Sequence, residues 1–133
     1  MAACRQLARD PRMVVTGLER ELGTPYTAAT LAFLVSRFPR VRWVWVMGAD
    51  NLASFHHWQR WRAIARTMPL AVVDRPGFRL RALASPAART FARNRMPEAK
   101  AAALADCAPP AWALLSARLC DLSSTALRLR SRN

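Results

Sequence analysis

A run of seven residues, 41–47, limits what this chain can fold into more than any other feature of its sequence. The run reads VRWVWVM, so it is almost wholly apolar and consists mainly of β-branched and aromatic residues. Such residues favour strands, and a strand that is apolar on both faces suits the middle of a parallel sheet. We therefore predict a central strand over residues 41–47 with both faces covered.

Strands and helices are expected to alternate along the rest of the chain. We expect a short β-rich run at 13–18 and strands at 70–73 and 112–115. The expected helices are 2–9, 28–37, 58–66 and 126–130. Residues 79–108 are expected to form helical pieces and loop. We expect Thr27 to cap the helix that follows it. Strands that alternate with helices form parallel sheets covered by helices, so the sequence predicts a single α/β domain over residues 1–133.

The length of 133 residues suits one domain, and the charge bears on what that domain binds. The chain has 21 Lys+Arg against 8 Asp+Glu, a formal net charge of +13, and residues 51–100 alone carry ten cations and two anions. Such an excess indicates an anionic partner, either nucleic acid or the phosphates of a nucleotide. The alternative is an arginine-rich composition on a solvated surface.

Several other classes of protein are disfavoured. No apolar run approaches the ~20 residues of a membrane span, and the N-terminus lacks the apolar stretch of a secretory signal. Cys4, Cys107 and Cys120 are odd in number and share no CxxC spacing, which argues against a disulfide framework and a zinc site. We expect a soluble, cytoplasmic protein with no metal ligands of its own and no membrane partner.

The adjacent histidines His56 and His57 have no acidic or cysteine partner at metal-ligand spacing. Adjacent side chains on a helix or turn are expected to diverge. We interpret the pair as surface or structural residues.

Three loops are expected to meet at the carboxyl ends of the strands, where parallel sheets bind ligands beside helix N-termini. These loops are residues 48–50, 74–77 and 122–125. In the first, Gly48 lets the backbone approach a ligand closely, and the carboxylate of Asp50 can accept hydrogen bonds from a ribose hydroxyl or an amine. An ordinary turn is the alternative interpretation.

The third loop carries hydroxyls at a helix start. Ser123, Ser124 and Thr125 offer hydroxyl and backbone N–H donors, and Arg128 follows one turn later. This combination can cradle phosphates, although simple capping of the helix explains the same residues.

Two tryptophans and one arginine stand beside these loops. Trp58 and Trp61 are spaced to share one helix face, as core residues or with one of them free to stack on an aromatic ring of a ligand. Arg75, between a strand end and a Pro-Gly turn, either reaches a phosphate or is a surface turn residue.

Taken together, these stretches resemble the bacterial nicotinate-nucleotide adenylyltransferases (nicotinate mononucleotide adenylyltransferases). The matching stretches are GTPYT at 23–27 with Thr30 and Leu31, WVMGADNL at 45–52 with Phe55, Trp58 and Trp61, DRPG at 74–77, and LSST at 122–125 with Leu127 and Arg128. Each is modest alone, but four in order over about residues 12–130 are specific.

The resemblance implies a fold and an activity. The fold is a Rossmann-like nucleotidyltransferase sheet of parallel strands with flanking helices. The activity is transfer of AMP from ATP to nicotinate mononucleotide, which gives deamido-NAD and pyrophosphate for NAD biosynthesis and uses Mg²⁺. The implied partners are therefore ATP and nicotinate mononucleotide, with no specific nucleic acid.

The resemblance also implies two groups of binding residues. Those for the nicotinate nucleotide are Tyr26, Thr27, Thr30, Trp58, Gln59 and Arg75, and those for ATP are Gly48, Asp50, Ser123, Ser124, Thr125 and Arg128. By similarity, Trp58 stacks on the nicotinate ring, backbone amides around Thr27 and Gln59 hold its carboxylate, and Arg75 contacts a substrate phosphate.

One departure from the family pattern concerns catalysis. The family opens with a first strand, a Gly-rich loop and an (H/T)xGH motif whose histidines contact the ATP phosphates, and this sequence contains none of them. We therefore expect a C-terminal portion of such a domain, lacking the first strand and the phosphate loop, with no catalytic residues assigned and little turnover. The alternatives are another nucleotidyltransferase of the superfamily, an inactive remnant with an exposed sheet edge, and a basic nucleic-acid-binding module.

Overall fold

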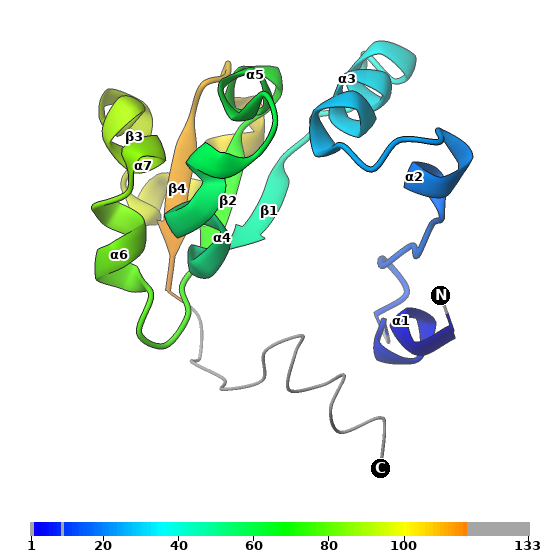
Figure 1. The fold of residues 1–133 in the computed structure, drawn as a ribbon, viewed down its shortest axis with the longest axis horizontal. Helices are drawn as coiled ribbons and strands as arrows, with labels where there is room; N and C mark the ends of the chain where they lie inside the picture. Colours follow the sequence, from blue (N-terminus) through cyan, green and yellow to red (C-terminus); the bar gives the residue numbers. More distant parts are fainter. Residues whose placement is uncertain (1, 9, 117–133) are drawn as a thin grey trace.

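The computed structural model describes residues 2–8 and 10–116 and contains a four-stranded parallel sheet (Figure 1). The strands are β1 (Trp45–Gly48), β2 (Leu70–Val73), β3 (Arg95–Met96) and β4 (Trp112–Leu115), in the order β1-β2-β4-β3. The fold is α/β, as the sequence predicted. The strands expected at 70–73 and 112–115 are confirmed to the residue.

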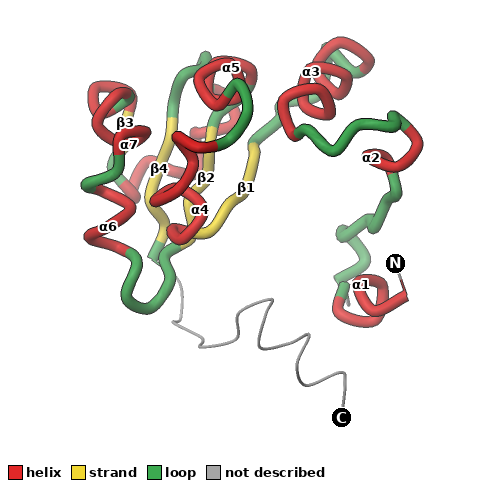
Figure 2. The backbone as a smooth tube through the Cα atoms, in the orientation of Figure 1, coloured by secondary structure: helices red, strands yellow, loops and turns green. Residues whose placement is uncertain are grey.

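Short helices connect the strands and cover the sheet (Figure 2). The α-helices are α1 (Ala2–Leu7), α2 (Leu18–Glu21), α3 (Thr27–Arg37), α4 (Ala49–Ser54), α5 (Trp61–Thr67), α6 (Arg79–Leu83) and α7 (Pro86–Thr90), and the 3₁₀ helices are η1 (Phe55–His57), η2 (Ala92–Asn94) and η3 (Glu98–Asp106). Helices α4, α5 and α7 pack with η1 on one face of the sheet, whereas η3 packs on the other. No helix in the described ranges is long and apolar enough to cross a membrane.

The larger core lies between the sheet and helices α3 to α7. Its largest fully buried side chains are Phe55, Leu31, Ile64 and Val72. The smaller core on the opposite face is built from Ala71, Ala113 and Leu104. Because β2 and β4 send alternate side chains into both cores, their unbroken apolar sequences are explained by burial on two faces.

The first strand differs from the prediction in position and in environment. Strand β1 begins at Trp45, so residues 41–44 precede the sheet, and β1 is an edge strand rather than a central one among the described residues. Val46 is 62% exposed, whereas Met47, which points to the larger core, is 4% exposed. The prediction of two covered faces is therefore wrong for β1, because a side chain's burial depends on neighbours that the strand's own residues do not specify.

Three further local predictions are corrected. Residues 13–17 form no strand, and α2 begins at Leu18. Thr27 is the first residue of α3 rather than its cap, since Tyr26 occupies the cap position without a capping side-chain hydrogen bond. The helix expected at 58–66 begins at Trp61, because Arg60 adopts a left-handed conformation with φ 55° that α-helices exclude.

Candidate functional site

The carboxyl ends of β1, β2 and β4 lie side by side and form one edge of the candidate site. The parallel register aligns Gly48 of β1 with Val73 of β2, and Val73 with Leu115 of β4. The backbone N–H of Asp74 continues this pairing by donating to the carbonyl of Leu115 at 2.8 Å. Two of the three loops predicted to meet here do so, and the third, residues 122–125, lies outside the described residues.

An ion pair joins the first two loops. Nε of Arg75 lies 3.1 Å from Oδ1 of Asp50, and the two side chains are 38% and 33% exposed. The contact lacks the alignment of a hydrogen bond, and no other group among the described residues is bonded to this buried oxygen. Because both groups are partly solvated, the attraction between them is modest, so a phosphate can compete for the guanidinium.

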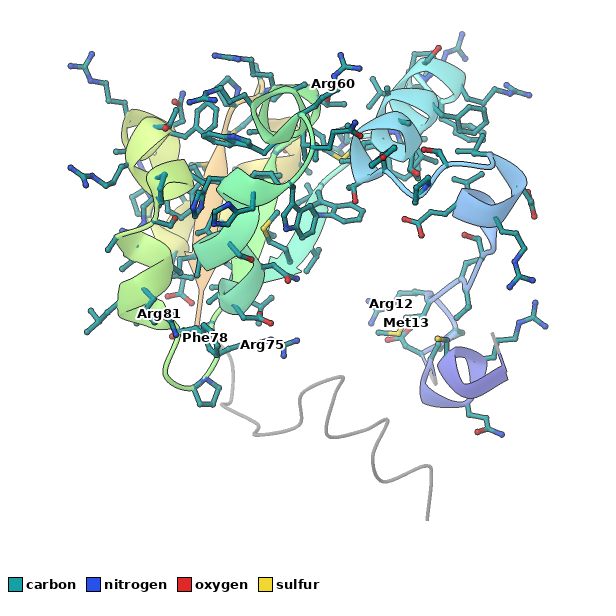
Figure 3. All side chains as sticks on the ribbon, viewed as in Figure 1. Arg12, Met13, Arg60, Arg75, Phe78 and Arg81 are labelled. Atoms are coloured by element: carbon teal, nitrogen blue, oxygen red, sulfur yellow. The ribbon has the colours of Figure 1, made fainter. Side chains whose placement is uncertain are left out.

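The turn after β2 sets the direction of Arg75. Oδ1 of Asp74 accepts a hydrogen bond from the backbone N–H of Arg75 at 2.8 Å, and Oδ2 accepts one from Nη1 of Arg79 at 2.8 Å. Arg75 lies at the lower edge of the sheet in Figure 3, beside Phe78. The carboxylate of Asp74 therefore stabilises the turn, and Arg75 extends from this turn to Asp50.

Gly48 is required by the close approach of this ion pair. A Cβ at position 48 would overlap Oδ1 of Asp50 and lie 2.6 Å from Nε of Arg75. The backbone of Gly48, with φ −80°, is open to any residue, so the requirement is for space and not for conformation. The glycine thus keeps the end of β1 clear for Asp50 and Arg75.

We expect Gly48→Ala to lower the free energy of unfolding by about 1 kcal/mol, the low end for overpacking, because the atoms in its way belong to side chains that can rotate. Urea unfolding followed by circular dichroism measures the change. In an Arg75→Ala background the same substitution should cost less, since Nε is gone and Asp50 is released. Equal costs in both backgrounds would contradict the steric explanation.

A separate cavity lies between the start of α3 and the turn before α5. It has a volume of about 420 Å³ and is lined by Pro25, Tyr26, Thr27, His57, Trp58, Gln59 and Ile64. This volume falls within the roughly 300–1,000 Å³ typical of small-molecule sites. Four of the six residues predicted for a nicotinate nucleotide, from two segments thirty residues apart in sequence, therefore line one cavity.

Two residues that line this cavity have unpaired backbone N–H groups. Within the described residues, neither the N–H of Thr27 nor that of Gln59 has a hydrogen-bond partner. Thr27 opens α3, whose eleven residues place the positive end of the helix dipole at the cavity. Donors and dipole together favour an anion or a carboxylate at this position.

The two tryptophans prove to have different environments. Trp61 is 8% exposed and belongs to the core, whereas Trp58 is half-buried and lines the cavity. They do not share a helix face, but both rings contact Phe55 in edge-to-face geometry, with centroids 5.4 Å (Trp58) and 6.0 Å (Trp61) from it. Trp58 therefore lines the cavity with an aromatic ring that packs against the buried ring of Phe55.

The remaining predicted residues lie elsewhere or outside the described ranges. Thr30 is 6% exposed, does not line the cavity, and has a hydroxyl without a partner among the described residues. Arg75 is at the sheet edge, not in the cavity lining. The residues predicted to bind ATP phosphates are outside the described part of the chain: Ser123, Ser124, Thr125 and Arg128.

His57 is a cavity residue that the sequence analysis interpreted as surface or structural and did not assign to the site. It contributes to the lining, and its ring lies 3.8 Å from that of His56, centroid to centroid. The expectation that the adjacent side chains diverge is therefore wrong, because the 3₁₀ turn of η1 brings them together. Its position next to Trp58 in the sequence was the signal that could have placed His57 in the cavity.

Asp10 and Arg12 form an ion pair at 2.7 Å in the segment that precedes α2. The pKa of Asp10 is lowered by hydrogen bonds from the side chain and backbone of Arg12, which lies in an exposed turn. Among the residues the structure describes, no group of three His, Cys, Asp or Glu side chains is placed to hold a metal ion. The described part of the site offers backbone donors, the Trp58 ring and the Asp50–Arg75 pair.

Comparison with known proteins assigns most of the chain to one family. Residues 4–130 match the cytidylyltransferase-like family model. A protein of Cereibacter sphaeroides is 54% identical over 132 residues, which are 99% of this chain and 70% of the relative. A protein of Agrobacterium fabrum is 50% identical over 128 residues, 96% of this chain and 68% of the relative. Both relatives are named probable nicotinate-nucleotide adenylyltransferases.

Proposed function

Because this chain belongs to the nicotinate-nucleotide adenylyltransferase family of cytidylyltransferase-like proteins, we propose that it transfers AMP from ATP to nicotinate mononucleotide in NAD biosynthesis. The products are deamido-NAD and pyrophosphate. The observation that carries the proposal is the cavity at Trp58, with unpaired N–H groups at Thr27 and Gln59. An aromatic surface and two donors in one cavity match an aromatic ring that bears a carboxylate.

In the proposed complex, the nicotinate ring stacks on Trp58 and its carboxylate accepts hydrogen bonds from the N–H groups of Thr27 and Gln59. The dipole of α3 adds a preference for the charged acid over the neutral amide. Tyr26, which is 50% exposed at the cavity edge, covers the ring from the side. Thr30 supports α3 from within the core and does not touch the ligand.

Adenylyl transfer asks little covalent chemistry of the protein. A phosphate oxygen of nicotinate mononucleotide forms a bond to the α-phosphorus of ATP, the bond to the β-phosphate bridging oxygen breaks, and pyrophosphate leaves. Positioning and neutralisation of charge lower the barrier to such a step. We propose that Arg75 contacts a substrate phosphate and exchanges its Asp50 partner for it.

The adenosine side of the site is proposed at the end of β1. Gly48 allows the ligand to approach the backbone, and Asp50 accepts a hydrogen bond from ATP once Arg75 has turned to a phosphate. The residues proposed to hold the ATP phosphates are Ser123, Ser124, Thr125 and Arg128. We propose that residues 1–133 belong to a single nucleotidyltransferase domain and form its C-terminal portion.

Mg²⁺ enters the proposal as the ion of MgATP. Mg²⁺ at such sites is bound largely by substrate phosphates and water, and the proposal assigns it no ligand from this chain. When bound, the ion neutralises phosphate charge. A cytoplasmic location is part of the same proposal and agrees with the free thiols of Cys4 and Cys107.

Isothermal titration calorimetry with nicotinate mononucleotide tests the proposed binding site. We expect binding to the 133-residue chain that is about tenfold or more tighter than binding of the amide nucleotide, because charged hydrogen bonds and the helix dipole favour the acid. Equal affinity for acid, amide and phosphopantetheine would contradict the assignment.

Chromatography of deamido-NAD tests the reaction itself. The substrates are ATP and nicotinate mononucleotide, and a chain that binds both but forms no deamido-NAD would contradict the proposed reaction.

A further inference from the structure

Much of the basic charge of residues 51–100 lies away from the candidate site. Arg75 and Arg79 are paired with carboxylates at the carboxyl edge of the sheet. Three other arginines, Arg62, Arg66 and Arg95, are exposed and come from α5 and β3. The charge excess of this segment is therefore not explained by contacts to ATP or to nicotinate mononucleotide.

These three arginines rest on one cluster of aromatic rings. The guanidinium carbon of Arg62 lies 4.3 Å from the Trp61 ring centroid, that of Arg66 lies 5.9 Å from Phe91, and that of Arg95 lies 5.4 Å from Trp112. The rings are themselves joined. Trp61 and Phe91 are 5.9 Å apart, and Nε1 of Trp112 donates to the carbonyl of Phe91 at 2.8 Å.

The cluster of Trp61, Phe91 and Trp112 joins three segments of the chain, namely α5, the end of α7 and β4. We call Arg62, Arg66 and Arg95 the arginine surface. Arg89 of α7 and Arg93 of η2, both exposed, flank Phe91 in sequence and extend it.

Acidic residues do not compensate the arginine surface. Asp74 is the one acidic residue between positions 51 and 97, and it is paired with Arg79 at the other end of the sheet. None of the ion pairs among the described residues involves Arg62, Arg66 or Arg95. Like charges that lie close together without counter-ions repel one another. Binding of an anionic partner would therefore reduce the electrostatic repulsion among these arginines.

We propose that the arginine surface binds single-stranded nucleic acid of no particular sequence. Guanidinium groups bind phosphates in bidentate fashion, and their planes stack on bases. Guanidinium groups that already contact rings lose less freedom on binding. Several cations spread over two elements suit a chain of phosphates better than one small anion.

The chemistry of the surroundings favours nucleic acid over a membrane. Attachment to a membrane surface combines basic residues with apolar side chains that enter the lipid. The large hydrophobic side chains exposed in the described part of the chain are Met13, Val14, Tyr26, Phe33, Phe38, Val41, Val46 and Leu80, and none belongs to α5, α7, η2 or β3.

The arginine surface and the candidate site lie at opposite ends of the sheet. Arg66 precedes β2 and Arg95 begins β3, so both are at amino ends of strands, whereas Gly48 and Arg75 are at carboxyl ends. Figure 3 shows the same separation between Arg60, at the start of α5, and Arg75. Nucleic acid and ATP can therefore bind together.

Fluorescence anisotropy with a labelled 20-nucleotide poly(U) RNA tests the proposal. At 100 mM NaCl we expect Arg62→Gln/Arg66→Gln/Arg95→Gln to weaken binding by about 10- to 100-fold and to reduce the slope of log affinity against log salt by about 2, since each lost phosphate contact to a single strand removes about 0.7. Added ATP should not displace the RNA.

A matched control variant distinguishes the effect of the arginine surface from the effect of a lower net charge. Arg5→Gln/Arg20→Gln/Arg81→Gln removes three exposed charges elsewhere, and Arg81 also covers an aromatic ring, that of Phe78. The control should weaken binding less than about threefold. Equal losses in the two triple variants, or displacement by ATP, would overturn the proposal.

Crosslinking of 4-thiouridine RNA to the unmodified chain gives a second readout that needs no variant. Crosslinks should fall within residues 61–67 and 89–95. Crosslinks confined to other segments, those of the candidate site included, would overturn the proposal. Binding of an acidic peptide with the same affinity as the RNA would also overturn it, in favour of a protein partner.

Discussion

Replacing Phe55 with alanine is expected to lower the free energy of unfolding by about 3–5 kcal/mol. The side chain is fully buried and touches the rings of both Trp58 and Trp61. Its loss leaves a cavity at the junction of η1, α4 and α5 that these short elements cannot close without separating. Because Trp58 rests on this ring, the wall of the ligand cavity should loosen as well.

Urea unfolding followed by far-ultraviolet circular dichroism measures this loss. Phe33→Ala is the matched control, since Phe33 is 37% exposed on α3, and it should cost much less. Phe55→Leu should recover most of the stability because it keeps much of the buried volume. A cost below about 1 kcal/mol for Phe55→Ala would mean that the site collapses freely, contrary to the close packing described here.

Replacing Trp58 with alanine is expected to weaken binding of nicotinate mononucleotide by about 10- to 100-fold, because stacking of a ligand ring on an aromatic side chain contributes about 1–3 kcal/mol. The effect on stability should be smaller, about 0.5–1.5 kcal/mol, from the lost contact with Phe55. Calorimetric titration with the nucleotide, at a temperature where the variant is folded, separates the two.

Two controls isolate the stacking contribution of Trp58. Trp58→Phe keeps an aromatic face and should bind within about tenfold of the parent chain. Trp45→Phe alters a tryptophan that packs against the core and does not line the cavity, so its affinity should not change. If Trp58→Ala bound the nucleotide as tightly as the parent chain, the proposed position of the nicotinate ring would be wrong.

The sequence predicted the buried strands better than the edges of the fold. Residues 70–73 and 112–115 are strands as expected, because side chains buried on both faces must be apolar in an unbroken run. Residues 41–44 are apolar except for Arg42 but precede the sheet, and Val46 is exposed. Pairing is decided by distant segments, so composition alone does not identify an edge strand.

Parts of the site could be predicted because short motifs mark chain turns. The resemblance placed Tyr26, Thr27, Trp58 and Gln59 together, and they line one cavity. His57 was interpreted as a surface or structural residue and not as a cavity residue, and the helical rule used for adjacent side chains does not hold in a 3₁₀ turn. Likewise, the left-handed residue just before α5 is an arginine, Arg60, and not a glycine that would have marked the start of this helix.

The two unpaired N–H groups of the cavity have a consequence for how substrate preference can change. In the proposed complex the acid is selected by main-chain atoms, which every residue except proline carries. Side chains at positions 27 and 59 can therefore drift during evolution without altering the choice between acid and amide. The preference for acid over amide then depends on the backbone conformation at positions 27 and 59. Changing this preference by design would require a change in that backbone conformation.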